Sequence, residues 1–417
     1  MSRVAFTLDG RAVHAEAGET ILDVARREGV EIPHLCWTPG LAPAGNCRAC
    51  MVEVEGERTL AASCCRQPSD GMQVSSASER ARASQRLVLE LLQADLPETV
   101  YTRHNEVDQW SAKLGVGKPR FAPRAQPAAD VSHPAIAVHL DACIQCTRCL
   151  RACRDEQAND VIGLALRGAH AKIVFDMDDP MGASTCVACG ECVQACPTGA
   201  LAPAHGAAMA ASDREVASLC PYCGVGCQLT FHVKDDRITH VQGRHGPANE
   251  GRLCVKGRYG FDYTRHPQRL TQPLIRRDGA PKRPEAALDP QRWHEVFREA
   301  SWDEALARAG SALRRIRDTN GAKALAGFGS AKGSNEEAYL FQKLVRLGFG
   351  SNNVDHCTRL CHASSVAALL EGIGSGAVSN PVRDVLQAEV IVVIGANPSV
   401  NHPVASSWIK NAVRAGA

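Results

Sequence analysis

The chain has 417 residues, a formal net charge of +2 and 5% aromatic residues. Its length predicts about three domains. Lysine and arginine are dispersed rather than gathered on one basic element, so we expect no nucleic-acid partner. No apolar run reaches the roughly 18 residues that a membrane span needs. The first residues carry no apolar signal core, and we therefore expect a cytoplasmic protein.

Nineteen cysteines dominate the composition. Disulfides are uncommon where thiols are kept reduced, and these cysteines recur in close C-x2-C sets that suit metal better than cross-links. Four cluster patterns account for all of them except Cys65, Cys357 and Cys361. The sequence therefore predicts several metal centres along one chain.

The first module, residues 1–80, is expected to be a β-grasp domain that holds a [2Fe–2S] cluster. Two alternating stretches, Val4–Leu8 and Arg11–Ala15, flank Asp9-Gly10, a type I′ hairpin signal, and a helix capped by Thr20 follows. Four cysteines then have the spacing C-x10-C-x2-C-x13-C, whose long first gap suits a plant-ferredoxin loop. Zinc is the alternative, but the lone outer cysteines do not form the second close pair of a zinc ribbon. The predicted ligands are Cys36, Cys47, Cys50 and Cys64.

The second module, residues 81–134, is expected to be a helical segment and linker that has lost a cluster. Leu87, Val88, Leu91 and Leu92 recur at helical spacing, which predicts core packing. Residues 91–116 resemble a segment of complex I large subunits, iron-only hydrogenases and many formate dehydrogenases. In those families it holds a [4Fe–4S] cluster on one histidine and three cysteines. The corresponding positions here are Asp95, Thr99, Thr102 and Asp108, and we predict no cluster.

Residues 135–205 contain two consecutive cysteine runs, each C-x2-C-x2-C-x3-C, the second followed by proline. This is the pattern of bacterial two-cluster ferredoxins, in which the fourth cysteine of each run ligates the other cluster. We therefore expect two [4Fe–4S] clusters with crossed ligands. One predicted set is Cys143, Cys146, Cys149 and Cys196. The other is Cys186, Cys189, Cys192 and Cys153.

Residues 215–270 carry a fourth set with the spacing C-x2-C-x3-C-x26-C, formed by Cys220, Cys223, Cys227 and Cys254. Strands are predicted at 228–233 and 237–242, separated by an Asp-Asp turn. With the segment Gly-Arg-Leu-Cys-Val-Lys-Gly at 251–257, this set resembles the small β-rich N-terminal cluster domain of molybdenum or tungsten bis-pterin oxidoreductases. The resemblance implies a third [4Fe–4S] cluster and places Lys256 between cluster and pterin. A lysine without this context would be interpreted as a solvated surface residue.

Residues 271–417 alternate predicted helices and strands. Helices are expected at 301–317 and 335–347, and strands at 322–328 and at 389–394 (Glu-Val-Ile-Val-Val-Ile). Strand–helix alternation with glycine at the strand ends predicts the start of a doubly wound parallel α/β sheet, with ligands at those ends. The segment after the second strand resembles the family's contact to the pterin guanine dinucleotide. The residues implied are Gly395, Asn397, Pro398, Asn401 and His402.

Cys361 stands in Arg-Leu-Cys-His-Ala-Ser-Ser, which resembles the metal-ligand site of formate dehydrogenases. There the cysteine or selenocysteine binds molybdenum or tungsten, and the histidine that follows is thought to assist substrate oxidation. The resemblance gives these roles to Cys361 and His362. A soft thiolate suits such a metal, and histidine can hold a proton near neutral pH. The alternative for a lone cysteine is a small buried hydrophobe. His356 precedes Cys357 instead of following it, so we expect Cys357 to be structural.

The whole chain resembles the N-terminal half of the catalytic α subunit of a cytosolic, NAD-dependent, molybdenum (or tungsten) formate dehydrogenase. The implied fold is multidomain, α+β and α/β. The implied cofactors are one [2Fe–2S] cluster, three [4Fe–4S] clusters and a molybdenum or tungsten bis-molybdopterin guanine dinucleotide. The implied reaction is reversible oxidation of formate to CO2. No G-x-G-x-x-G turn occurs, so NAD reduction would need a partner subunit with flavin and further Fe–S clusters. The family's subunit continues well beyond Ala417, and we expect the isolated chain not to turn over formate.

Other classes remain open from sequence. A sister molybdopterin oxidoreductase such as nitrate reductase is also cysteine-ligated. A complex I large subunit or an iron-only hydrogenase shares the front end, although complex I lacks the doubled ferredoxin run and the Cys361-His362 pair. An electron-relay protein with a degenerate α/β domain is the non-enzyme alternative. Metal analysis separates these, because molybdenum or tungsten indicates the enzyme and iron alone indicates the relay.

Overall fold

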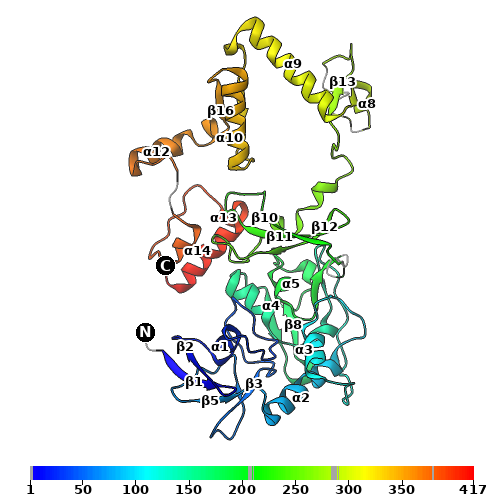
Figure 1. Ribbon diagram of the computed structural model, residues 1–417. Helices are drawn as coiled ribbons and strands as arrows, with labels where there is room; N and C mark the ends of the chain where they lie inside the picture. The colour runs from blue at the N-terminus through cyan, green and yellow to red at the C-terminus, as the bar shows by residue number, and fades with distance from the viewer. Residues whose placement is uncertain (1–2, 205–208, 210, 283–288, 290, 378–379) are drawn as a thin grey trace. The chain divides into compact units, whose positions relative to one another are not determined.

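The computed structural model describes residues 3–204, 209, 211–282, 289, 291–377 and 380–417. The described chain forms two compact units (Figure 1). One contains the residues up to Phe261 together with Pro381–Ala417, and the other is Asp262–Asn380. Two boundaries of the predicted modules, residues 1 and 205, lie outside the described residues. In the described ranges, no helix has both the length and the apolar character that a bilayer crossing requires.

The N-terminal part of the first unit is a five-stranded sheet with the order β2-β1-β5-β3-β4, crossed by helix α1 (Figure 1). The predicted hairpin is confirmed, because β1 and β2 pair antiparallel around Asp9 and Gly10, both with positive φ. Helix α1 begins after Thr20, whose side chain accepts a hydrogen bond from the Asp23 backbone N–H in a capping box. The elements are β1 (Val4–Leu8), β2 (Arg11–Ala15), α1 (Ile21–Arg27), β3 (Met51–Val54), β4 (Ala61–Ala62) and β5 (Gln73–Ser75).

Two helices follow, α2 (Glu79–Asp95) and α3 (Glu106–Leu114). The prediction of core packing was wrong for two of its four residues, because Leu87 and Leu91 are 43% and 45% exposed. The inward face of α2 is instead Ala81, Gln85 and Leu89, which recur every fourth residue. The buried Gln85 amide donates to the carbonyls of Met51 (2.9 Å) and Ser76 (3.1 Å), so a polar anchor fixes the register of this helix.

The ferredoxin part consists of two similar halves. Strand β6 (Ile136–Val138) pairs antiparallel with β9 (Leu201–Pro203), which joins the beginning of the part to its end. Strands β7 (Ile162–Ala165) and β8 (Lys172–Phe175) form a second hairpin. Each cysteine run carries a short helix, α4 (Arg148–Arg151) or α5 (Glu191–Ala195), and α4 continues as a π-helical turn, Ala152–Glu156.

The last part of the first unit is a three-stranded antiparallel sheet of β10 (Arg214–Leu219), β11 (Gln228–Lys234) and β12 (Arg237–Gly243). The predicted turn between β11 and β12 is confirmed, with Asp235 and Asp236 at φ +48° and +57°. Helix α6 (Val255–Tyr259) follows. The chain later returns to this unit through a 3-10 helix (Val382–Gln387), α13 (Pro398–Asn401) and α14 (Pro403–Ala415).

The second unit contains a short parallel pair, β15 (Gly327–Gly329) and β16 (Val354–His356), connected through α10 (Asn335–Lys343) and a π-helical turn (Leu344–Phe349). This is the strand–helix–strand unit that the sequence predicts. The helix expected at 301–317 is α9 (Trp302–Asn320), capped by Ser301. The remaining elements are a 3-10 helix (Asp262–Arg265), β13 (Leu274–Arg276), α8 (Trp293–Val296), β14 (Phe297–Glu299), α11 (Thr358–Cys361) and α12 (Ala363–Ile373).

Two predicted strands differ from the structure. The strand expected at 322–328 is reduced to β15, and it follows a 3-10 helix at Ala322–Ala324. Residues 389–394 form no strand, and Val390, Val392 and Ile394 are 77%, 73% and 85% exposed. A strand needs a hydrogen-bonded neighbour, and no described strand pairs with this segment. Apolar, β-branched composition therefore did not suffice to form it.

Candidate metal centres

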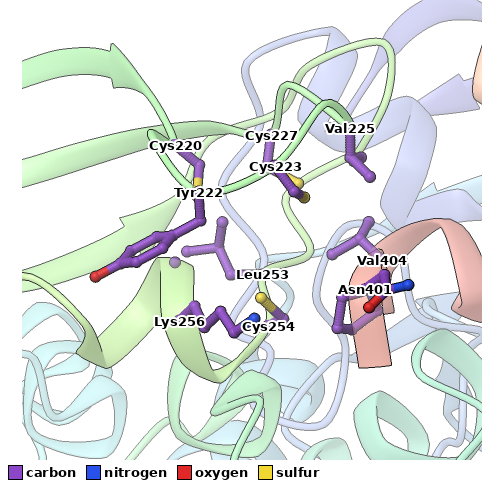
Figure 2. A pocket seen from close by; sticks show the side chains of 12 residues that line it. Cys220, Tyr222, Cys223, Val225, Cys227, Leu253, Cys254, Lys256, Asn401 and Val404 are labelled. Atoms are coloured by element: carbon purple, nitrogen blue, oxygen red, sulfur yellow. The ribbon is translucent and has the colours of Figure 1, made fainter. Parts of the chain in front are cut away.

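Four cysteine sulfurs surround a cavity in the β10–β12 part of the first unit (Figure 2). The β10–β11 connection brings Cys220 and Cys227 together, with the Cys220 N–H donating to the Cys227 carbonyl (2.9 Å). Cys254 stands immediately before α6, so the helix begins at the cavity wall. A Cβ on Gly243 would lie 1.7 Å from the Gly251 carbonyl oxygen. Only glycine allows β12 to approach the loop that carries Cys254 this closely.

Lys256 and Asn401 line the same cavity as these four cysteines (Figure 2). Lys256 comes from the first turn of α6 and Asn401 from the end of α13, so two segments about 145 residues apart in sequence meet here. The sequence analysis placed Lys256 between cluster and pterin, and it placed Asn401 at the pterin guanine dinucleotide. Gly395 and Asn397 lie in the exposed segment before α13, the half-buried Pro398 is the first residue of α13, and His402 joins α13 to α14.

The eight cysteines of the ferredoxin part are buried or half-buried. Thiols of different runs lie close enough to influence one another. Cys196 raises the pKa of Cys143 and Cys146, whereas Cys153 raises that of Cys186 and Cys189. Burial is the larger cause and raises the pKa of Cys143 to about 11 and that of Cys146 to about 12. Thiols crowded in this way are costly to ionise unless positive charge lies among them, as iron supplies in a cluster.

Three cysteines of the first set lie on the loop before β3, and Cys64 lies in the turn after β4. Cys36, Cys50 and Cys64 are buried and Cys47 is half-buried. The Cys36 N–H points at the Cys47 sulfur (3.4 Å), the kind of N–H to sulfur contact that stabilises a cluster. The thiols are close enough to interact with one another, so that the pKa of Cys36 is lowered and that of Cys64 is raised. Cys65 is exposed.

The positions that would ligate the lost cluster of the second module have other roles. Asp95 accepts a hydrogen bond from the Arg124 backbone N–H (3.0 Å) and forms an ion pair with its side chain (3.3 Å). Thr102 packs against Gly199, where a Cβ would lie 2.9 Å from its methyl group. Thr99 is exposed, and burial raises the pKa of Asp108.

In the second unit, the segments after β15 and β16 meet at the carboxyl ends of the two parallel strands. The Ala331 N–H donates to the Cys357 sulfur (3.3 Å), which ties the two segments together. Cys361 is the last residue of α11, and His362 separates α11 from α12. Both side chains are exposed. A residue at this edge of a parallel sheet is placed where such folds bind ligands.

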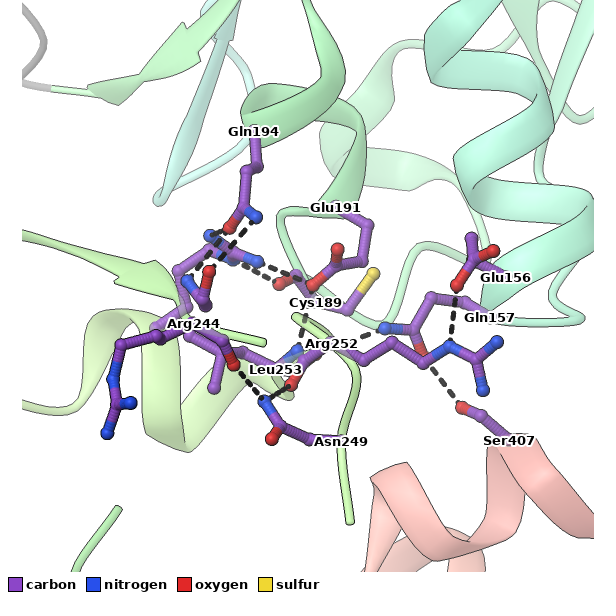
Figure 3. Close-up of polar contacts among 12 residues, drawn as sticks. Glu156, Gln157, Cys189, Glu191, Gln194, Arg244, Asn249, Arg252, Leu253 and Ser407 are labelled. Atoms are coloured by element: carbon purple, nitrogen blue, oxygen red, sulfur yellow. Dashed lines mark hydrogen bonds and ion pairs between the residues drawn. The ribbon is translucent and has the colours of Figure 1, made fainter. Parts of the chain in front are cut away.

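Sequence reasoning missed a set of buried charged residues at the junctions between the cysteine sets. Arg258 forms an ion pair with Glu191 (2.5 Å), and both are almost fully buried. Figure 3 shows Glu191 beside Leu253, and the Glu191 carboxylate accepts a hydrogen bond from the Leu253 backbone N–H (2.8 Å). Arg148 and Arg151 of α4 are each 5% exposed. Charged residues are ordinarily solvated, and the only available signal was that all four lie within or next to a cysteine motif.

Four family models match the chain. They are a 2Fe-2S iron–sulfur cluster binding domain (residues 1–79), the ferredoxin-like domain of NADH-quinone oxidoreductase subunit 3 (133–202), the molybdopterin oxidoreductase Fe4S4 domain (213–266) and molybdopterin oxidoreductase (269–417). The chain therefore carries domains of a molybdopterin oxidoreductase. Its family cofactors are a [2Fe–2S] cluster, [4Fe–4S] clusters and a molybdenum or tungsten pterin. The predicted multidomain fold class and cofactor classes are therefore confirmed.

Relatives in this family include a putative formate dehydrogenase of Staphylococcus haemolyticus (strain JCSC1435), which is 31% identical over 97% of this chain and 44% of the relative. The probable oxidoreductase YjgC of Bacillus subtilis (strain 168) is 30% identical over the same shares. The chain thus spans less than half the length of these relatives. A crystal structure of an NAD+-reducing [NiFe]-hydrogenase aligns with 48% of this chain and 88% of that chain, with 29% identity and a TM-score of 0.46.

Proposed function

We propose that the chain is the electron-relay and pterin-binding part of a formate dehydrogenase. The observation that carries the proposal is the cavity in which four cysteine sulfurs, Lys256 and Asn401 meet. A cluster held there would lie against the residues expected to face the pterin. Formate as the substrate is supported by the Cys361-His362 pair and by the name of the Staphylococcus haemolyticus relative.

The proposed reaction is HCOO− → CO2 + H+ + 2e−. When bound, the molybdenum or tungsten pterin supplies the two-electron acceptor. Cys361 would provide the thiolate ligand of the metal, and the exposed His362 would take up the proton that formate releases. Lys256 would hold a positive charge beside the cluster and the pterin, where it favours the arrival of an electron.

We further propose that electrons leave singly through the set at 220–254, the ferredoxin pair and the [2Fe–2S] centre. Contacts join the segments that carry the proposed ligands at both junctions. Arg258, four residues after Cys254, donates to the Cys189 carbonyl (2.6 Å). Cys36 and Cys146 belong to one apolar core. The match to the ferredoxin-like domain of NADH-quinone oxidoreductase subunit 3 supports an NAD-reducing partner subunit with flavin and Fe–S clusters as the electron acceptor.

The test compares Cys361→Ser with Cys357→Ser in the intact protein assembled with its partner. We expect Cys361→Ser to abolish formate-dependent dye reduction while the EPR signals of the Fe–S clusters persist. Cys357→Ser should retain most of the activity. Metal analysis of the same samples should find molybdenum or tungsten. Iron as the sole metal would identify an electron-relay protein instead, and undiminished formate oxidation by Cys361→Ser would refute the proposed ligand.

A further inference from the structure

Helix α4 sends two buried arginines into the junction between the first cysteine set and the ferredoxin part. The Arg148 guanidinium lies 2.8 Å from the Glu106 carboxylate and also donates to the Leu35 carbonyl (3.3 Å). The Arg151 guanidinium donates to the carbonyls of Ala42, Cys36 and Cys146, the last at 3.4 Å. Arg151 therefore contacts the backbone of one proposed ligand from each of two different clusters.

The two arginines differ in how their charge is balanced. Arg148 is neutralised by a carboxylate, whereas no ion pair among the described residues includes Arg151, whose hydrogen-bond acceptors are all carbonyls. A buried cation without an anion is strongly destabilising. A cluster with four thiolate ligands carries a net charge of about −2 when oxidised, because the thiolates and sulfides outweigh the iron charge. The missing counter-charge for Arg151 is thus present when the neighbouring clusters are bound.

The surroundings make this charge effective. Cys36 and Cys146 pack in one apolar core with Leu35, Ala49 and Ile144. Electrostatic interactions are stronger in such a region than at a solvated surface. The side chains of Asn46 and Thr147 form a further hydrogen bond across the junction (2.7 Å). Helices α2 and α3 pack into the same core through Leu89, Val107 and Leu114, so the module without cysteines covers part of the junction.

We propose that Arg151 is the positioning residue for electron transfer between the [2Fe–2S] cluster of Cys36, Cys47, Cys50 and Cys64 and the [4Fe–4S] cluster of Cys143, Cys146, Cys149 and Cys196. Its forked guanidinium fixes the spacing of the two ligand loops by bonding both. Its positive charge favours the reduced, more negative state of both clusters. Electrons then cross this junction directly, without a cluster in the second module.

The junction at Arg258 provides an internal contrast. That arginine also donates to a proposed ligand carbonyl, of Cys189, but Glu191 neutralises it. We therefore expect a neutral mechanical link at that junction and a charged link at Arg151. The inference rests on the cluster assignment and not on formate as the substrate, because electrons can be supplied chemically.

The test is an EPR-monitored redox titration of the full chain loaded with its clusters, with dithionite as the reductant. The variants are Arg151→Gln, Arg151→Lys and the control Arg154→Gln. Arg154 follows α4 on the same helical run, is 49% exposed at its side chain and pairs with Asp155. At the wild-type midpoint potential, we expect Arg151→Gln to raise the oxidised-to-reduced ratio of both clusters about tenfold. This corresponds to a midpoint about 59 mV lower for a one-electron couple.

Arg151→Lys should keep both ratios within about twofold of wild type, because the charge remains, but should weaken the magnetic coupling between the reduced clusters. Arg154→Gln should change neither quantity. Loss of the [2Fe–2S] signal in Arg151→Gln with its retention in Arg151→Lys would also support the proposal, since the cation is then needed to hold the cluster. The proposal is overturned if Arg151→Gln titrates like Arg154→Gln, or if Arg151→Gln and Arg151→Lys lose the clusters equally.

Discussion

Removing the Glu191 carboxylate should loosen the junction between the ferredoxin part and the set at 220–254. Glu191 lies at the start of α5 and accepts hydrogen bonds from the Arg258 guanidinium (2.5 Å) and the Leu253 backbone N–H (2.8 Å). Burial raises the pKa of Glu191, and Arg258 opposes that shift. Glu191→Ala would leave a buried guanidinium without its anion and a buried N–H without an acceptor.

The expected cost follows from the burial of both partners, which are 8% and 4% exposed. Breaking a buried ion pair by removing one partner costs about 3–5 kcal/mol. Glu191→Gln should cost about 1–3 kcal/mol, because its amide oxygen can still accept the Leu253 N–H. Replacing both partners, as in Glu191→Leu with Arg258→Met, should recover much of the loss, since no unpaired charge then remains.

Hydrogen exchange is the appropriate assay, because a chain of several parts does not unfold in one two-state transition. The opening free energy of the amides at 253–258 reports the junction directly. The control is Glu295→Gln, which breaks an exposed pair with Arg292 and should leave exchange throughout the first unit unchanged. If the opening free energy of the 253–258 amides is the same in Glu191→Ala as in Glu295→Gln, the buried pair does not hold the junction.

Three further predictions concern positions elsewhere in the first unit. Gly190→Ala should lower the opening free energy measured by hydrogen exchange by about 2–4 kcal/mol, against about 1 kcal/mol for Gly56→Ala. Both glycines have positive φ, but a Cβ on Gly190 would lie 2.0 Å from a side-chain carbon of the buried Arg258, whereas a Cβ on Gly56 would face open space. Iron analysis of the loaded chain should find about 14 atoms, falling to about 10 in Cys220→Ala and unchanged in Cys65→Ala. Burial and a stacked histidine lower the pKa of His240 to about 4. As the pH falls below about 6.5, His240 is protonated in the unfolded chain before it is protonated in the folded chain, so the folded state loses stability. His240→Gln removes this group and should reduce the loss of stability between about pH 6.5 and pH 4.

Local signals in the sequence predicted local structure well. Asp9-Gly10 and Asp235-Asp236 form the expected turns, because positive φ is a property of the turn residues themselves. Thr20 and Ser301 cap the expected helices, since a cap needs only the backbone N–H groups three residues on. The cysteine spacing at 220–254 likewise predicted residues that line one cavity, and the ligand sets themselves stay predictions.

Features that depend on distant partners were not predictable from local pattern. The apolar segment at 389–394 has strand composition but no strand to pair with in the described chain. The inward face of α2 is set by the polar anchor Gln85, which periodicity in leucine and valine does not reveal. The charge at Arg151 is buried by segments more than 100 residues away in sequence. Such contacts become visible only when the fold has been determined.

Helix α14 has a consequence for how the protein is made. Trp408 packs against the Arg252 guanidinium (3.5 Å) and donates to the Ala248 carbonyl (2.9 Å), while Ser407 bonds Gln157 (2.6 Å) across 250 residues. A growing chain must therefore leave the wall beside Leu253 exposed until α14 has left the ribosome. Contacts so distant in sequence form slowly. The cysteine set at 220–254 therefore acquires its complete surroundings only after α14 has been synthesised.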